Sequence, residues 1–185
     1  MDSINPEGAL AAHHRQSPAV DPTGEVQFDT PTYLFHLFAV LQRHRDQRLD
    51  NDLQALGLNV ALHRALSVIG RMEPCSMKQL AELAAVDRTT MTRTVDQLVR
   101  AGLVERSTPP SDRRQVLLNL TADGRQTLDQ ALRVIYRLNR AVLAGLDESA
   151  QRSFVRAERA MLVNLVPDET LRENLFRMDR PDQPD

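Results

Sequence analysis

The chain is poor in cysteine, in aromatic residues and in long apolar runs. Cys75 is the only cysteine among 185 residues, which excludes an intrachain disulfide and fits a reducing compartment. Tryptophan is absent and aromatic residues make up 4% of the chain, so the core must consist mainly of Leu, Val and Ala, which favours helices. No apolar run approaches the roughly 20 residues of a membrane-spanning helix, and the first residues lack the apolar centre of a secretion signal. We therefore expect a cytoplasmic protein.

Motifs for catalysis and for metal binding are also missing. The sequence contains no glycine-rich phosphate loop, no nucleophile elbow, and no cluster of Cys and His with the spacing of a zinc site. The neighbouring acids Asp147 and Glu148 lie where a helix cap explains them. We expect neither an enzyme nor a bound metal or cofactor.

The charge balance limits how the chain can bind nucleic acid. The formal net charge is −2 and the pI is about 6.2, so the protein is not generally basic. Any contact with DNA must therefore come from a local basic patch on a neutral or acidic background.

Two short helices are predicted in the middle of the chain. Ser76, followed three residues later by Gln79, forms a capping-box pattern that predicts a helix start. Asp87 can cap a second helix, and Gly102 can end it in the left-handed conformation. The apolar positions of the first helix are Met77, Leu80, Ala81 and Ala84, and those of the second are Met91, Val95 and Leu98.

The face of the second helix opposite its apolar stripe is basic and rich in hydroxyls. Hydroxyl and guanidinium groups near a helix start suit phosphate contact, and arginine pairs bidentately with guanine in the major groove. The alternative is a solvated helix whose arginines pair with Asp87 and Asp96. The side chains of this face are Arg88, Thr89, Thr90, Thr92, Arg93, Gln97 and Arg100.

A β-hairpin with a basic tip is predicted after Gly102. Leu103 and Val104 begin one strand, and an apolar run from Val116 to Leu120 forms the other. Arg113 and Arg114 lie in the long loop between them and suit the narrow minor groove, with Asp112 orienting one guanidinium while the other contacts DNA. The alternative interpretation is a polar hairpin loop.

This order of helix, basic helix, basic hairpin and further helix resembles the MarR family of winged helix-turn-helix regulators. The resemblance covers roughly Pro31 to Val166, and it implies a mainly α fold with a small β-hairpin wing and a helical dimerisation lobe. The residues that carry it are Leu80, Ala81, Leu83, Thr92, Arg93, Val95, Asp96, Leu98, Gly102, Leu103, Val104, Arg106, Asp112, Arg113, Arg114, Leu120, Thr121 and Gly124.

The domain organisation follows from this resemblance and from the helix signals. We expect a flexible arm over residues 1–29, a helical dimerisation region over 30–56 and 121–166, a DNA-binding lobe over 57–120, and an acidic tail over 167–185. The long amphipathic helices need a partner, and a second copy of the chain is the expected one. In the tail, Leu171, Leu175 and Phe176 either pack a short helix on the dimer or belong to a disordered segment. The first long helix is expected to bury Leu34, Leu37, Phe38, Leu41 and Leu49.

The predicted function is a homodimeric, ligand-responsive transcription regulator, most often a repressor in the resembling family. It would read a pseudo-palindromic DNA duplex, with Thr89, Thr90, Thr92 and Arg93 in the major groove, Arg113 or Arg114 in the minor groove, and Arg88 and Arg100 on phosphates. The resemblance also implies a small aromatic carboxylate or phenolic effector. The residues that could bind this effector are His36, Arg43, His44, His63 and Arg64. The alternative is that they are ordinary surface or core residues.

Two other functions remain open at this point. A winged-helix module could bind another protein without DNA. A thiol-based redox regulator could act through Cys75, which lies at a helix N-terminus where the pKa of a thiol can fall. The competing interpretation of Cys75 is a half-exposed structural thiol.

Overall fold

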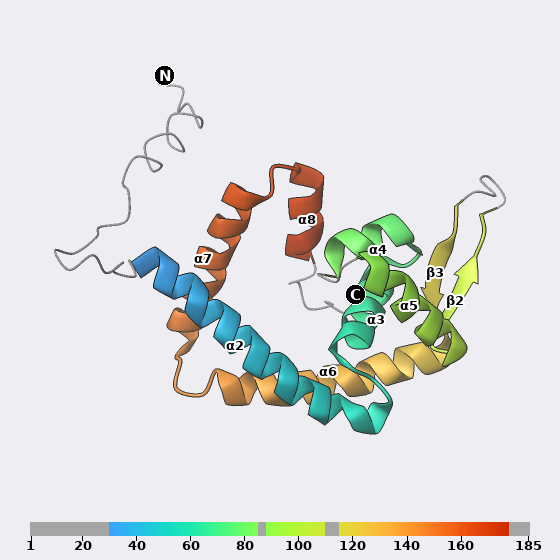
Figure 1. Ribbon diagram of the computed structural model, residues 1–185, viewed down its shortest axis with the longest axis horizontal. Coiled ribbons are helices and arrows are strands. Elements are labelled where there is room, and N and C mark those ends of the chain that lie inside the picture. Colours follow the sequence, from blue (N-terminus) through green and yellow to red (C-terminus); the bar gives the residue numbers. More distant parts are fainter. Residues whose placement is uncertain (1–29, 85–87, 110–114, 178–185) are drawn as a thin grey trace, which may run out of the picture. The chain divides into compact units, whose positions relative to one another are not determined.

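The structure, a computed structural model, describes residues 30–84, 88–109 and 115–177 (Figure 1). The chain divides into two units, Met1–His44 and Arg45–Asp185, which we describe separately. Helices dominate the described residues, and the strands form one small antiparallel sheet. The expected mainly α fold with a small β-hairpin is confirmed.

The first long helix, α2 (Thr30–Leu53), begins at a Thr-Pro pair and contributes residues to both units. Leu49 and Leu53 are buried in the second unit. Leu34, Leu37 and Leu41 were expected to be buried, but they are 43%, 46% and 45% exposed. The helical period correctly identifies an apolar face of α2. It does not show what covers that face, and the covering residues need not come from the same chain. A 3-10 turn, η1 (Gln54–Leu56), follows, and Gly57 with φ 66° ends it.

Helix α3 (Val60–Met72) forms the centre of the second unit. Its start is capped by Asn59, whose side chain accepts a hydrogen bond from the Leu62 amide at 2.8 Å. Asp50 of α2 accepts another from the Val60 amide at 2.6 Å. Leu66 and Ile69 are fully buried, and α3 contacts both helices of the predicted helix pair, two strands and the later helix α6.

The predicted helix pair is present. Helix α4 (Met77–Leu83) starts with the expected capping box, because the Ser76 hydroxyl accepts from the Gln79 amide and the Gln79 side chain accepts from the Ser76 amide. Helix α5 (Arg88–Arg100) follows, and Gly102 takes the left-handed conformation with φ 71°. The expected cap Asp87 lies outside the described residues.

The sheet has the strand order β1-β3-β2 and is antiparallel throughout. The hairpin is formed by β2 (Val104–Ser107) and β3 (Leu117–Leu120), with Val104 opposite Leu120 and Ser107 opposite Leu117. The third strand, β1 (Cys75–Ser76), pairs with the other edge of β3. It was not predicted, because two residues are too few to show an alternating pattern.

Helix α6 (Ala122–Val142) is capped by Thr121, whose hydroxyl accepts from the Gly124 amide at 2.9 Å. Gly124 is buried against the chain that precedes the hairpin. A Cβ atom at this position would lie 1.9 Å from the Leu103 carbonyl oxygen. Only glycine therefore allows the first turn of α6 to lie this close to the helix-to-strand turn.

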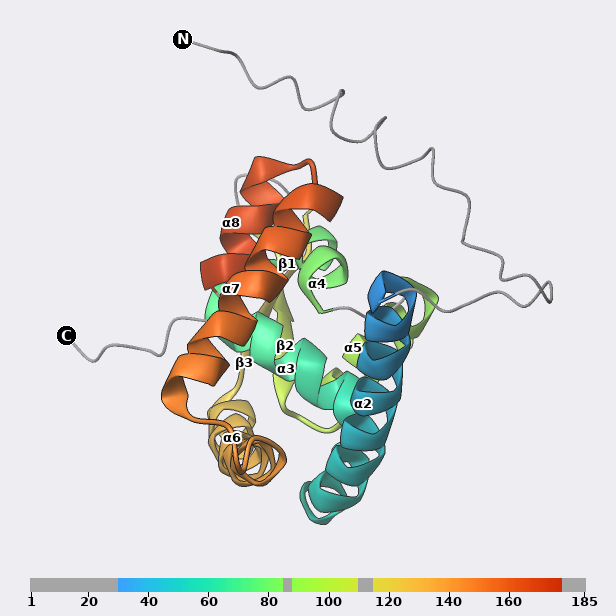
Figure 2. The same ribbon diagram turned by 90° about the vertical axis from the view of Figure 1, so that its left-hand side faces the viewer.

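Two further helices complete the second unit. Helix α7 (Glu148–Leu165) is capped by Asp147 as expected and has no fully buried residue. Helix α8 (Glu169–Arg177) follows after a short turn, so the part of the expected tail that contains Leu171, Leu175 and Phe176 is helical. Figures 1 and 2 show α8 beside α7. No helix within the described ranges has the length and apolarity needed to cross a membrane.

Candidate nucleic-acid interface

Helix α5 is fixed to the second unit by its apolar stripe. Met91, Val95 and Leu98 are buried with at most 1% exposure, as the helical period predicts. Thr94 is also buried, and its hydroxyl donates to the Thr90 carbonyl oxygen at 2.9 Å, so no buried polar group is left without a partner there. The helix contacts α3 and β2 (Figure 1). These buried contacts fix which side of α5 faces away from the second unit.

The outer face of α5 is open to solvent. Among the described residues, no hydrogen bond or ion pair involves the side chain of Arg93 or Arg100. The acidic residue of the helix, Asp96, pairs with Arg106 of β2 instead of neutralising these arginines. The exposed side chains of this face are Thr90, Thr92, Arg93, Gln97 and Arg100. Arg88 and Thr89 belong to the first turn of α5, but their side chains lie outside the described residues.

The hairpin lies next to α5 in the fold, through the contact of α5 with β2. The Arg106–Asp96 ion pair joins the strand to the helix, and Asn119 donates to the Ser107 hydroxyl across the strands at 2.9 Å. The tip, residues 110–114 with Arg113 and Arg114, lies outside the described residues. The assignment of these two arginines to the minor groove therefore stays a prediction.

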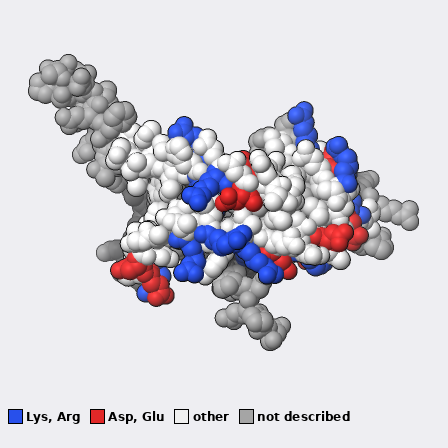
Figure 3. Space-filling model, turned by 90° about the horizontal axis from the view of Figure 1, so that it is seen from below, with Lys and Arg blue, Asp and Glu red and all other residues white. Residues whose placement is uncertain are grey.

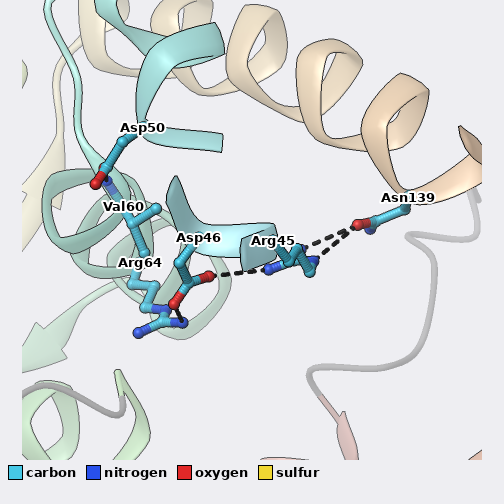
Figure 4. Close-up of polar contacts among 6 residues, drawn as sticks. All are labelled: Arg45, Asp46, Asp50, Val60, Arg64 and Asn139. Atoms are coloured by element: carbon cyan, nitrogen blue, oxygen red, sulfur yellow. Dashed lines mark hydrogen bonds and ion pairs between the residues drawn. The ribbon is translucent and has the colours of Figure 1, made fainter. Parts of the chain in front are cut away.

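The candidate effector residues fall into two groups. His36, Arg43 and His44 are exposed on α2 in the first unit. His63 and Arg64 are neighbours in α3 of the second unit, where Arg64 donates to Asp46 at 2.8 Å (Figure 4). Asp46 also accepts from Arg45 at 3.3 Å. Arg45 in turn donates to Asn139 of α6 at 3.0 Å, so the network joins α2, α3 and α6.

His63 is buried beside this network, and the Ser67 hydroxyl lies 3.3 Å from its Nε2 atom. Burial, together with the positive charges of Arg45 and Arg64, lowers the pKa of His63 to about 4. The ring is therefore uncharged at neutral pH and offers an anion a hydrogen bond at most. Arg64 already has a carboxylate partner, so neither residue is a free positive charge.

A basic groove along α6 was not found in the sequence. It has a volume of about 1090 Å³, and Arg71, Arg133 and Arg137 line it together with the apolar side chains of Leu132 and Tyr136. Figure 3, seen from below, shows Lys and Arg side chains on this side of the molecule, with Asp and Glu side chains among them. The spacing of the two α6 arginines, one helical turn apart, is the signal that could have indicated it.

Cys75 lies in β1 and is fully buried. Its thiol donates to the Ser76 carbonyl oxygen at 3.5 Å, and burial raises its pKa to about 11. The expectation of a half-exposed thiol is wrong, because pairing of β1 with β3 places this residue inside the core. A thiol with a raised pKa carries little of the reactive thiolate at neutral pH. Within the described ranges, no group of His, Cys, Asp and Glu could hold a metal ion.

Comparisons with known proteins agree with this arrangement. The MarR family model matches residues 58–116, which contain α3, β1, α4, α5 and the first strand of the hairpin, β2. The HTH-type transcriptional regulator BilQ of Clostridium symbiosum is 28% identical over 102 residues, which cover 55% of this chain and 71% of BilQ. The multiple antibiotic resistance protein MarR of Salmonella typhimurium is 30% identical over 97 residues, which cover 52% of this chain and 67% of that protein.

Solved structures give the same result. A MarR variant from Escherichia coli complexed with operator DNA matches with a TM-score of 0.65 and 25% identity, over 75% of this chain and 99% of that one. Bordetella bronchiseptica BpsR, whose DNA binding is regulated by 6-hydroxynicotinic acid, matches with a TM-score of 0.56 and 25% identity, over 68% of this chain and 98% of BpsR. The chain therefore belongs to the MarR family of transcriptional regulators.

Proposed function

We propose that this regulator binds a pseudo-palindromic operator, with α5 in the major groove and the tip of the hairpin in the minor groove. The observation that carries the proposal is the orientation of α5, whose apolar stripe is buried while its hydroxyl and guanidinium face is exposed. The E. coli MarR variant bound to operator DNA supports it, because that protein shares the fold over almost its whole length. We assign base contacts to Thr89, Thr90, Thr92 and Arg93, phosphate contacts to Arg88 and Arg100, and a minor-groove contact to Arg113 or Arg114.

A homodimer is the proposed binding form. Large apolar side chains are exposed on α2, α6 and α7, and a single chain leaves them in water at a cost of about 25 cal/mol for each Å². A second copy would cover them and would place two recognition helices about one DNA turn, roughly 34 Å, apart. We propose residues 30–56 and 121–166 as the dimerisation region. The exposed apolar side chains include Tyr33, Leu34, Leu37, Leu41, Leu132, Tyr136, Phe154, Val163 and Leu165.

A small aromatic carboxylate or phenolic anion is the proposed effector, and it would release the operator. The regulation of BpsR by an aromatic acid supports this class of ligand. The groove along α6 offers such a molecule guanidinium groups beside apolar surface, from Arg133, Arg137 and Tyr136. Of the five residues first considered, His36, Arg43 and His44 keep exposed side chains, whereas His63 and Arg64 are engaged within the second unit.

Repression would follow if the operator overlaps a promoter. The effector would act by binding more tightly to a dimer whose recognition helices are wrongly spaced for the operator. Redox control through Cys75 is disfavoured, because the thiol is buried and its pKa is raised.

The test is fluorescence anisotropy with duplexes tiled across the DNA upstream of the gene, each repeated with excess random competitor. We expect one segment that contains an inverted repeat to stay bound at a competitor excess that removes the others. Equal competition on every segment would contradict sequence-specific regulation. A thermal-shift screen of aromatic acids and phenols follows, and any stabilising compound should release the bound segment.

A further inference from the structure

The C-terminal helix α8 connects α7 to the DNA-binding helix pair. Leu171 and Leu175 pack against the apolar core, and α8 contacts both α4 and α7 (Figures 1 and 2). Among the described residues, α8 is the element that α7 contacts most extensively. Helix α8 lies outside residues 58–116, so its contact with α4 is not part of the segment that matches the family model.

The turn from α7 into α8 is held by several contacts. The Asp168 side chain accepts from the Leu171 amide at 3.0 Å and so caps α8. Arg172 donates to the carbonyl oxygens of Val166 and Pro167, which satisfies groups at the end of α7. Between the two helices, the guanidinium of Arg159 in α7 lies 5.1 Å from the centre of the Phe176 ring in α8. Helix α8 is therefore tied to α7 by polar and cation–π contacts and to α4 by apolar contact.

Helix α4 needs this support more than the longer helices do. It has seven residues, and an isolated helix of that length is unstable in water, so packing must hold it. Among the described residues, its other extensive contacts are with α3 and β1. In a helix-turn-helix, the first helix crosses the DNA backbone. Lys78, whose side chain is 85% exposed and lies 3.9 Å from Glu82, is the basic residue that α4 presents to solvent.

We propose that α8 positions the DNA-binding lobe: Leu171 and Leu175 hold α4 in place, and α4 in turn places Lys78 for a phosphate contact. The DNA part rests on the proposed function, whereas the coupling of α8 to α4 does not. The two leucines are positioning residues, since they act through α4 and touch no DNA.

The coupling is tested by hydrogen exchange on the full chain without DNA. The variant carries Leu171→Ala and Leu175→Ala together, and the control is Glu173→Ala, a change at an exposed position of the same helix. In the variant, protection of the amides in residues 77–84 should fall roughly tenfold more than protection in α6, and the control should change neither. An equal fall in both helices, or no fall in either, would overturn the proposal. If the double variant does not fold, Phe176→Leu removes the ring contact with Arg159 and is read in the same way.

The proposed phosphate contact of Lys78 is tested by introducing Lys78→Gln into the parent chain and into the variant that carries Leu171→Ala and Leu175→Ala. In the parent chain, Lys78→Gln should weaken duplex binding by roughly threefold and make its salt dependence shallower. In the double leucine variant, most of that effect should be missing, because Lys78 is already misplaced. Fully additive losses would overturn the positioning role. If the parent chain binds no duplex, the proposed function fails, and the hydrogen-exchange result alone decides the coupling.

Discussion

Replacing His63 by glutamine should remove a dependence of folding stability on pH. The imidazole is buried in α3 near the guanidinium groups of Arg45 and Arg64, and its pKa in the folded chain is about 4. In the unfolded chain the ordinary histidine pKa is about 6.5. Protons therefore bind the unfolded chain more tightly. The contribution of His63 to stability is complete above about pH 6.5 and is lost as the pH falls toward 4.

The size of this effect follows from the two pKa values. A shift of one unit corresponds to about 1.4 kcal/mol, so the full loss between pH 6.5 and pH 4 is about 3 kcal/mol. Between about pH 7.5 and pH 5 the same linkage gives a loss of about 2 kcal/mol in the free energy of unfolding. The folded molecule cannot avoid this loss without moving the ring or admitting water, because Arg45 is bonded to Asn139 and Arg64 to Asp46.

The assay is urea unfolding followed by circular dichroism at several pH values between about 5 and 7.5. The parent chain should lose about 2 kcal/mol over this range, and His63→Gln should lose markedly less. Val68→Ala, a change at a neighbouring buried position of α3 that carries no titrating group, serves as the control. It should lower stability at every pH without altering the slope. Parallel pH profiles for the parent chain and His63→Gln would refute the reasoning.

Three further predictions concern the framework of the second unit. Gly124→Ala should destabilise the fold by roughly 2 kcal/mol or more in thermal unfolding, because the added methyl group meets the Leu103 carbonyl oxygen; an unchanged melting temperature would contradict this. The hydrogen bond from Arg125 lowers the pKa of Glu73, so stability should fall with pH below about 4.5, and Glu73→Gln should flatten that part of the profile. Cys75 should react with a thiol reagent at about pH 8 at least roughly a hundredfold more slowly in the folded than in the unfolded chain, and rapid labelling of folded protein would reopen redox control.

Local signals in the sequence were sufficient for most of the fold. The capping box at Ser76, the left-handed Gly102 and the caps at Thr121 and Asp147 all mark helix ends by interactions within a few residues, and the structure has them. The same holds for the stripe on α5, since the helical period alone places its residues on one face.

Interactions between distant segments could not be predicted in this way. One alternative was that Asp96 pairs with the arginines on the outer face of α5. It does not, because its carboxylate forms an ion pair with Arg106 of the neighbouring strand. Burial of Cys75 depends on pairing with β3, and engagement of Arg64 depends on Asp46 one helix earlier. Helical periodicity also cannot say whether an apolar face is covered by the same chain or by another, which is why Leu41 was misplaced.

The most direct test of the account compares Arg93→Ala and Arg100→Ala on operator and random duplexes. Both arginines are exposed on α5, and the first is assigned to bases and the second to phosphates. Arg93→Ala should weaken operator binding by about 1–3 kcal/mol, relax the preference at one base pair, and leave binding to random DNA nearly unchanged. Arg100→Ala should weaken both duplexes alike and make the salt dependence shallower. Equal losses on both duplexes for Arg93→Ala would contradict the claim that the outer face of α5 reads the operator.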